Sequence, residues 1–119
     1  MSLLGFLKHS TANGAPALAA IDAATARQWH AGKEYRFIDI REDAEFGAEH
    51  ITGAQLAPLS RLEQALPGDR KGAKAVFYCL SGMRTKTNAA RLAGLGFGEA
   101  YLLEGGLRAW KAEGAPTEH

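Results

Sequence analysis

The sequence has one cysteine, Cys79, among its 119 residues. A single cysteine excludes an internal disulfide, and the absence of Cys-x-x-Cys pairs excludes a four-ligand zinc site. We therefore expect a reducing compartment, no metal site and no cofactor. The expected location is the cytoplasm, with membrane association if the native protein is longer.

An excess of charge of one sign is also absent. Fourteen Lys and Arg residues face 13 Asp and Glu residues, which leaves a formal net charge of +1. A protein that binds nucleic acid usually has a basic surplus, so we expect no nucleic-acid partner. These totals still allow a local cluster of positive charge that binds a small anion.

Long hydrophobic runs are missing. Stretches such as "AVFYCL" are far too short to span a bilayer. The opening "MSLLGFLKHS" has neither a basic n-region nor a proper h-region, so it makes a poor signal peptide. We expect residues 1–16 to form a loose N-terminal tail and residues 17–119 to form a single domain, as the chain length suggests.

Short apolar runs alternate with helix-like segments along the chain. The five runs are residues 18–21, 36–40, 54–57, 74–79 and 99–103. Their alternation predicts an α/β fold with three layers, α/β/α, and a five-stranded, mainly parallel central sheet. Right-handed crossovers place the carboxyl ends of the strands at one edge, where sites form in such sheets. Cys79, Arg41 and Glu104 lie at this edge.

Local signals indicate where helices begin and end. Asp22 is a plausible N-cap for the first helix. Ser60 and Glu63 have the spacing of a capping box. After the cysteine, we expect one helix that ends at Gly94 and Gly96.

Cys79 lies at the junction between a buried strand and a helix. A cysteine nucleophile reacts as the thiolate, and the amides and dipole of such a junction supply positive potential. Gly82 permits a tight loop, Arg84 can bind an oxyanion or anchor the loop, and Thr85 offers a hydroxyl. The alternative is that Cys79 is a small buried hydrophobe and Ser81 caps an ordinary turn.

Three motifs carry a resemblance to a known family. "CLSGMRT" resembles the active-site loop of rhodanese-like sulfurtransferases, Cys-x-x-Gly-x-Arg-Ser/Thr. "FIDIREDAEFGAEHITGAQLAPLS" and "LAGLGFGEAYLLEGGLRAW" are similar to the family's first and closing signatures. Together the motifs cover residues 17–116. The run "EHI…LAPLS.LE" is similar in particular to the single-domain type fused to a bacterial inner-membrane hairpin. The family often has glycine where this chain has Glu49.

The resemblance implies a thiosulfate:cyanide sulfurtransferase-like enzyme with the rhodanese fold. Cys79 would take a sulfane sulfur from a small anionic donor such as thiosulfate, become a persulfide, and transfer the sulfur to cyanide or to a small-molecule or protein thiol. Arg84 would bind the donor or brace the loop, and Thr85 would hydrogen-bond the sulfur. The implied active-site loop consists of Leu80, Ser81, Gly82, Met83, Arg84 and Thr85.

Further residues of the signatures have supporting roles in this interpretation. We expect Asp39 and Arg41 to hold neighbouring loops through ion pairs or backbone bonds, and Glu45 to pair with an arginine. His50 is expected to bond to backbone rather than act as a base. Lys86 either attracts the anion or is a solvated helix charge.

Three other functions remain as alternatives. Phosphatases and arsenate reductases of this fold class use Cys-x5-Arg, whereas four residues separate Cys79 from Arg84 here, so they rank lower. A non-catalytic rhodanese module that binds a partner or senses redox state usually lacks the cysteine or the loop glycine, and this chain keeps both. A thiol–disulfide oxidoreductase is disfavoured because the chain has no resolving cysteine, so a persulfide must go to an external acceptor. The oligomeric state stays open.

Overall fold

The computed structural model describes residues 18–119, and the predicted N-terminal tail lies outside the described residues. The strands are β1 (Ala19–Ile21), β2 (Arg36–Asp39), β3 (His50–Ile51), β4 (Gln55–Leu56), β5 (Lys74–Tyr78), β6 (Glu99–Leu103) and β7 (Thr117–Glu118). The helices are α2 (Ala23–Gly32), α3 (Asp43–Ala48), η1 (Leu59–Arg61, a 3-10 turn), α4 (Leu62–Ala65), α5 (Met83–Thr87), α6 (Ala89–Ala93) and α7 (Gly106–Ala112).

The central sheet confirms the predicted α/β fold. It has five strands in the order β1-β6-β5-β2-β4, and every neighbouring pair is parallel. Alternate residues of β5 enter two separate core clusters, with Val76 and Tyr78 in one and Ala75 and Phe77 in the other. β5 is therefore buried on both faces, as expected for a central parallel strand.

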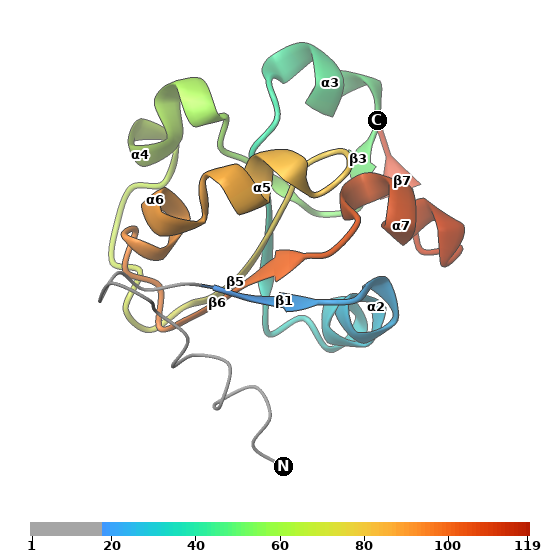
Figure 1. Ribbon diagram of the computed structural model, residues 1–119, viewed down its shortest axis with the longest axis horizontal. Coiled ribbons are helices and arrows are strands. Elements are labelled where there is room, and N and C mark those ends of the chain that lie inside the picture. Colours follow the sequence, from blue (N-terminus) through green and yellow to red (C-terminus); the bar gives the residue numbers. More distant parts are fainter. Residues whose placement is uncertain (1–17) are drawn as a thin grey trace.

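Helices cover both faces of the sheet and make the predicted three layers. Ala26 of α2 and Trp110 of α7 pack in one core cluster. Leu62 of α4 and Leu92 of α6 pack in the other. Figure 1 shows α2 separated by the sheet from α4 and α6. None of the helices among residues 18–119 is long and apolar enough to cross a membrane.

The predicted helix ends are partly correct. Asp22 does cap α2, because its Oδ1 accepts the Thr25 N–H at 2.8 Å. The predicted capping box at Ser60 is wrong. Ser60 lies inside the η1 turn, before α4 begins, and its Oγ donates instead to Glu42 Oε1 at 2.8 Å.

The single helix predicted after the cysteine is also wrong, because Asn88 divides it into α5 and α6. Asn88 has φ −106° and ψ 18°, outside helical geometry. Its Nδ2 donates to Arg84 O at 2.8 Å. The backbone bonds from Asn88 N–H to Arg84 O at 3.1 Å and from Leu92 N–H to Asn88 O at 3.0 Å persist, so the break is confined to the dihedral angles of one residue.

A second, two-stranded sheet was not predicted. β3 pairs antiparallel with β7, with His50 opposite Glu118. This pairing brings the carboxyl end of the chain beside the connection between α3 and β4, near the C label of Figure 1.

Candidate active site at the cysteine loop

Cys79 is the residue that follows β5, and it is fully buried. Its Sγ accepts a hydrogen bond from the Gly82 N–H at 3.1 Å. Gly82 has φ 95° and precedes α5 directly. Residues with a side chain rarely adopt this left-handed backbone conformation. Glycine here therefore lets the backbone turn and direct its amide at the sulfur.

The first turn of α7 holds the other side of the cysteine loop. The backbone N–H groups of Leu107 and Arg108 donate to Cys79 O at 2.8 Å and to Leu80 O at 3.0 Å. Gly106 makes this approach possible, because a Cβ at this position would lie 2.5 Å from Cys79 O. The "EGGLR" segment therefore supports the cysteine, a role that sequence analysis did not assign to it although the paired glycines before a helix were visible.

Arg84 forms a two-pronged ion pair with Glu45. Its Nη1 and Nη2 donate to Glu45 Oε1 and Oε2 at 2.9 and 2.8 Å. The guanidinium lowers the pKa of Glu45 to about 2, and Glu45 raises the pKa of Arg84. Of the two roles considered for Arg84, this geometry matches the one that braces the loop, by tying α5 to α3.

Thr85 differs from the role that the family resemblance implied. Its hydroxyl donates to Gly82 O at 3.0 Å and is buried. The hydroxyl has one hydrogen, and this hydrogen goes to backbone rather than to the sulfur. In this structure Thr85 therefore stabilises the turn at Gly82.

Asp39 and Arg41 form a buried ion pair beside α3 and do not contact the sulfur. Arg41 Nη2 lies 2.8 Å from Asp39 Oδ2 and also donates to Glu49 O at 2.6 Å. Next to this pair, the Tyr78 hydroxyl accepts the Ile51 N–H at 3.0 Å, and burial raises the pKa of Tyr78. The pair thus fixes the segment that carries Glu45.

His50 and Glu49 also hold this segment in place. His50 Nδ1 lies 2.7 Å from Phe46 O, and its ring stacks on Phe46 with 3.7 Å between the ring centres. Glu49, which replaces the glycine common in the family, accepts hydrogen bonds from Lys111 Nζ at 2.7 Å and Thr117 Oγ1 at 2.8 Å. The departure from the family pattern therefore adds a link to α7 and β7.

Three exposed residues lie on the loop or on the helix turns that adjoin it in α5 and α7, one apolar and two cationic. Met83 is 64% exposed and is the only exposed large hydrophobic residue among residues 18–119. Lys86 and Arg108 are exposed as well, and neither forms an ion pair in the described part of the chain. A cavity of about 50 Å³ lies here, bordered by Met83, Lys86 and Glu104. Within the same described part, no group of three His, Cys, Asp or Glu side chains could hold a metal ion.

Comparisons with known proteins agree with this arrangement. An uncharacterised protein of Synechocystis sp. is 42% identical over 80 residues, which are 67% of this chain and 45% of that protein. The thiosulfate sulfurtransferase GlpE of Pseudomonas putida is 33% identical over 63% of this chain and 68% of its own length. The crystal structure of a thiosulfate sulfurtransferase from Pseudomonas aeruginosa superposes with a TM-score of 0.73 at 34% identity, over 87% of this chain and 20% of that one.

The chain thus spans less than half of the length of the Synechocystis protein. The model of the rhodanese-like domain family matches residues 22–113, which include the cysteine loop, the Asp39–Arg41 pair and the glycines before α7. The chain belongs to the rhodanese-like domain family.

Proposed function

We propose that this chain is a sulfurtransferase in which Cys79 carries sulfur as a persulfide. The observation that carries the proposal is the hydrogen bond from the Gly82 amide to Cys79 Sγ at 3.1 Å. A backbone donor directed at the sulfur stabilises the negative charge that sulfur carries during transfer. The two relatives named as thiosulfate sulfurtransferases support thiosulfate as the donor.

The reaction proceeds in two displacements. In the first, the Cys79 thiolate attacks the outer sulfur of thiosulfate, the sulfur–sulfur bond of thiosulfate breaks, and sulfite leaves with the electron pair. In the second, cyanide or a thiolate attacks the terminal sulfur of the persulfide, and the Cys79 thiolate leaves. The products are thiocyanate or a new persulfide, and neither step needs an oxidant or a reductant.

The surrounding residues position the loop and attract the donor. The Arg84–Glu45 pair and the α7 amides hold the backbone on both sides of Cys79. Lys86 and Arg108 provide positive charge on the helix turns that adjoin the loop, where an anion approaches. Because Cys79 is fully buried, the loop side chains must move to admit the donor.

The proposal is tested by thiocyanate formation from thiosulfate and cyanide. We expect turnover by the chain and none by Cys79→Ser. Gly72→Ala serves as a control and should keep the turnover of the unmodified chain, because a Cβ at Gly72 meets nothing within 4 Å. Equal thiocyanate formation by the chain and by Cys79→Ser would refute the proposal.

A further inference from the structure

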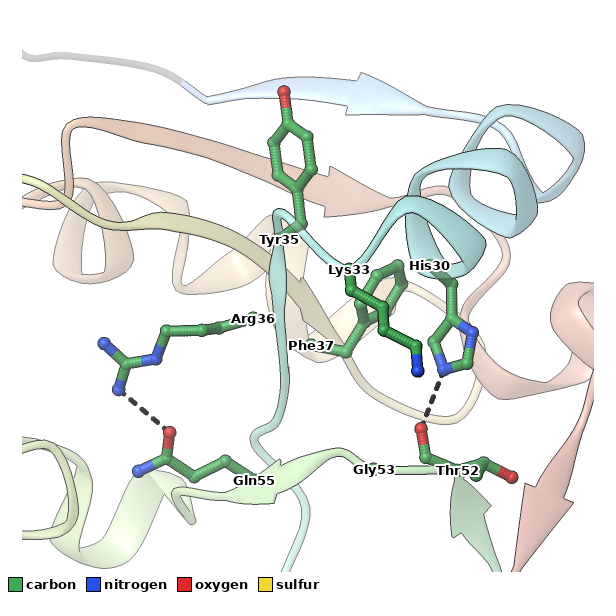
Figure 2. A pocket seen from close by; sticks show the side chains of 8 residues that line it. All are labelled: His30, Lys33, Tyr35, Arg36, Phe37, Thr52, Gly53 and Gln55. Carbon is green, nitrogen blue, oxygen red and sulfur yellow. Dashed lines mark hydrogen bonds between the residues drawn. The ribbon is translucent and has the colours of Figure 1, made fainter.

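A cavity lined by residues of α2, β2 and β4 lies away from the cysteine loop. It has a volume of about 410 Å³ and lies between the first half of β2 and residues 52–55 (Figure 2). Arg36 at this cavity is paired in the sheet with Ala75, four residues before Cys79. β4 pairs with β2 only at Ile38 and Asp39, so the sheet is open beside Arg36.

The cavity is cationic. Its lining contains no Asp or Glu, and it includes His30, Lys33, Arg36, Phe37, Thr52 and Gln55. Figure 2 shows the Lys33 side chain extended toward His30 at one end of the cavity and Arg36 at the other end. A ligand that fits both cations therefore carries negative charge at two separated points.

The Lys33 amine is available for a ligand. No ion pair or side-chain hydrogen bond of Lys33 occurs within residues 18–119. The adjacent carboxylate, Glu34, is engaged by Lys74 at 3.2 Å. A second carboxylate, Glu118, accepts the Gly53 N–H at 3.0 Å and is bonded to His50 too.

The other end of the cavity holds a fixed guanidinium. Arg36 Nη2 donates to Gln55 Oε1 at 2.9 Å, and the guanidinium carbon lies 5.2 Å from the centre of the Phe97 ring. These contacts occupy one donor and one face of the group. The remaining N–H groups can bind a carboxylate or a phosphate.

Lys33 occupies a backbone position that favours glycine. It has φ 62°, and it is the only non-glycine residue with positive φ in the described part of the chain. Its N–H donates to Trp29 O at 3.2 Å and to His30 O at 3.3 Å, and these bonds close the carboxyl end of α2. Helices commonly end with glycine in this conformation, and Gly32 lies one position too early to provide it. A lysine here reduces stability, and strain of this kind points to a role for the side chain.

We propose that this cavity binds an elongated organic dianion, with one carboxylate or phosphate group at Lys33 and another at Arg36. Phe37, which is 4% exposed, and Gln55 also line the cavity, next to the part of a ligand that joins its two charged groups. The volume lies within the range of small-molecule sites, roughly 300–1,000 Å³. This site is independent of the sulfur transfer proposed for Cys79.

Titration calorimetry with succinate, adipate and suberate tests the proposal, with hexanoate as the matched monoanion. We expect one of the three dicarboxylates to bind about tenfold more tightly than hexanoate, because a second charge-assisted contact is worth about one factor of ten. Lys33→Gly and Arg36→Gln should each remove this advantage. Arg91→Gln, which removes an exposed arginine on α6, should keep it.

Lys33→Gly gives a second, opposite readout. Because glycine relieves the left-handed backbone, we expect its melting temperature to rise by about 4 °C while the affinity for the dicarboxylate falls. Equal binding of dicarboxylates and hexanoate, or an equal loss of affinity in Lys33→Gly and Arg91→Gln, would overturn the proposal. Sulfur loading of Cys79 in these same variants is a separate measurement, so failure of either proposal is recognised without the other.

Discussion

At the scale of single residues, the sulfur of Cys79 depends on backbone rather than on side chains. The Gly82 amide contacts Sγ, while the Thr85 hydroxyl and the Arg84 guanidinium bond to Gly82 O and to Glu45. The sequence could predict the cysteine, the glycine and the pairing of Glu45 with an arginine. It could not predict the direction of the Thr85 hydroxyl, because a rotation about one side-chain bond decides this.

Gly82→Ala tests the backbone donor. Alanine at φ 95° is strained, and its Cβ would lie 3.1 Å from Gly105 N, so the loop must shift. We expect a loss of about 1–2 kcal/mol in the free energy of unfolding and at least about a tenfold loss in thiocyanate formation. Gly72→Ala is the control, because a Cβ there meets nothing within 4 Å. Full activity of a destabilised Gly82→Ala would contradict the role of this amide.

The Arg84–Glu45 pair predicts a pH dependence of stability. The pKa of Glu45 falls from 4.5 to about 2 in the folded chain, so folding favours its ionised form. The pair therefore contributes its full stability above about pH 5 and loses it as the pH falls toward 2. Because the side chains are 38% and 36% exposed, solvent screens the pair and we expect only about 1 kcal/mol.

Chemical unfolding of the chain and of Glu45→Gln between pH 7 and pH 2 measures this contribution. The difference in unfolding free energy should be constant near neutral pH and shrink toward zero in acid. The unfolding free energy of the double variant Arg84→Gln/Glu45→Gln should lack the loss in acid that the ion pair causes in the unmodified chain. If the difference in unfolding free energy between the two proteins instead increased in acid, the result would contradict a stabilising Arg84–Glu45 pair.

At the scale of elements, sequence patterns predicted the strands that carry a regular apolar pattern. They missed the features that depend on one or two residues. Strands β2, β5 and β6 bury apolar runs that are visible in the sequence, whereas β4 has only two half-buried residues. The break at Asn88 lies in the dihedral angles of one residue, and η1 depends on a tight turn after Pro58. The β3–β7 pair has two residues on each side, which is too short for any periodicity to show.

The number of residues between Cys79 and Arg84 sets the size of the cysteine loop. One residue inserted after Met83, the first residue of α5, shifts Arg84 and its pair with Glu45 by one position relative to Cys79. We expect at least about a tenfold fall in thiosulfate turnover, together with new hydrolysis of p-nitrophenyl phosphate, because a wider ring of amides suits a tetrahedral oxyanion. Unchanged thiosulfate turnover would refute loop size as the basis of substrate choice.

At the scale of the whole molecule, a net charge of +1 conceals two local concentrations of positive charge. One lies at Lys86 and Arg108 outside the cysteine loop, and the other lies in the cavity between Lys33 and Arg36. The net charge could not reveal either concentration, because the carboxylates that balance the total charge pair with other cations elsewhere in the chain. Local potential rather than net charge therefore directs anions on this molecule.

Lys86→Glu and Arg108→Glu test the charge outside the loop. We expect each to raise the KM for thiosulfate several-fold at low salt with little change in kcat, because the effect acts on the approach of the anion. The difference from the unmodified chain should shrink at high salt, where charges are screened. Lys71→Glu, on an exposed turn remote from the loop, should change neither constant; a fall in kcat at constant KM would point to a role in the chemical step instead.

The intact mass of the chain after incubation with thiosulfate, under non-reducing conditions, tests the central claim most directly. The persulfide account predicts one added sulfur atom, which is absent in Cys79→Ser and is released by cyanide as thiocyanate. A mass that stays unchanged, while the Cys79 thiol still reacts with an alkylating reagent, would contradict the claim that this loop accepts sulfur from thiosulfate.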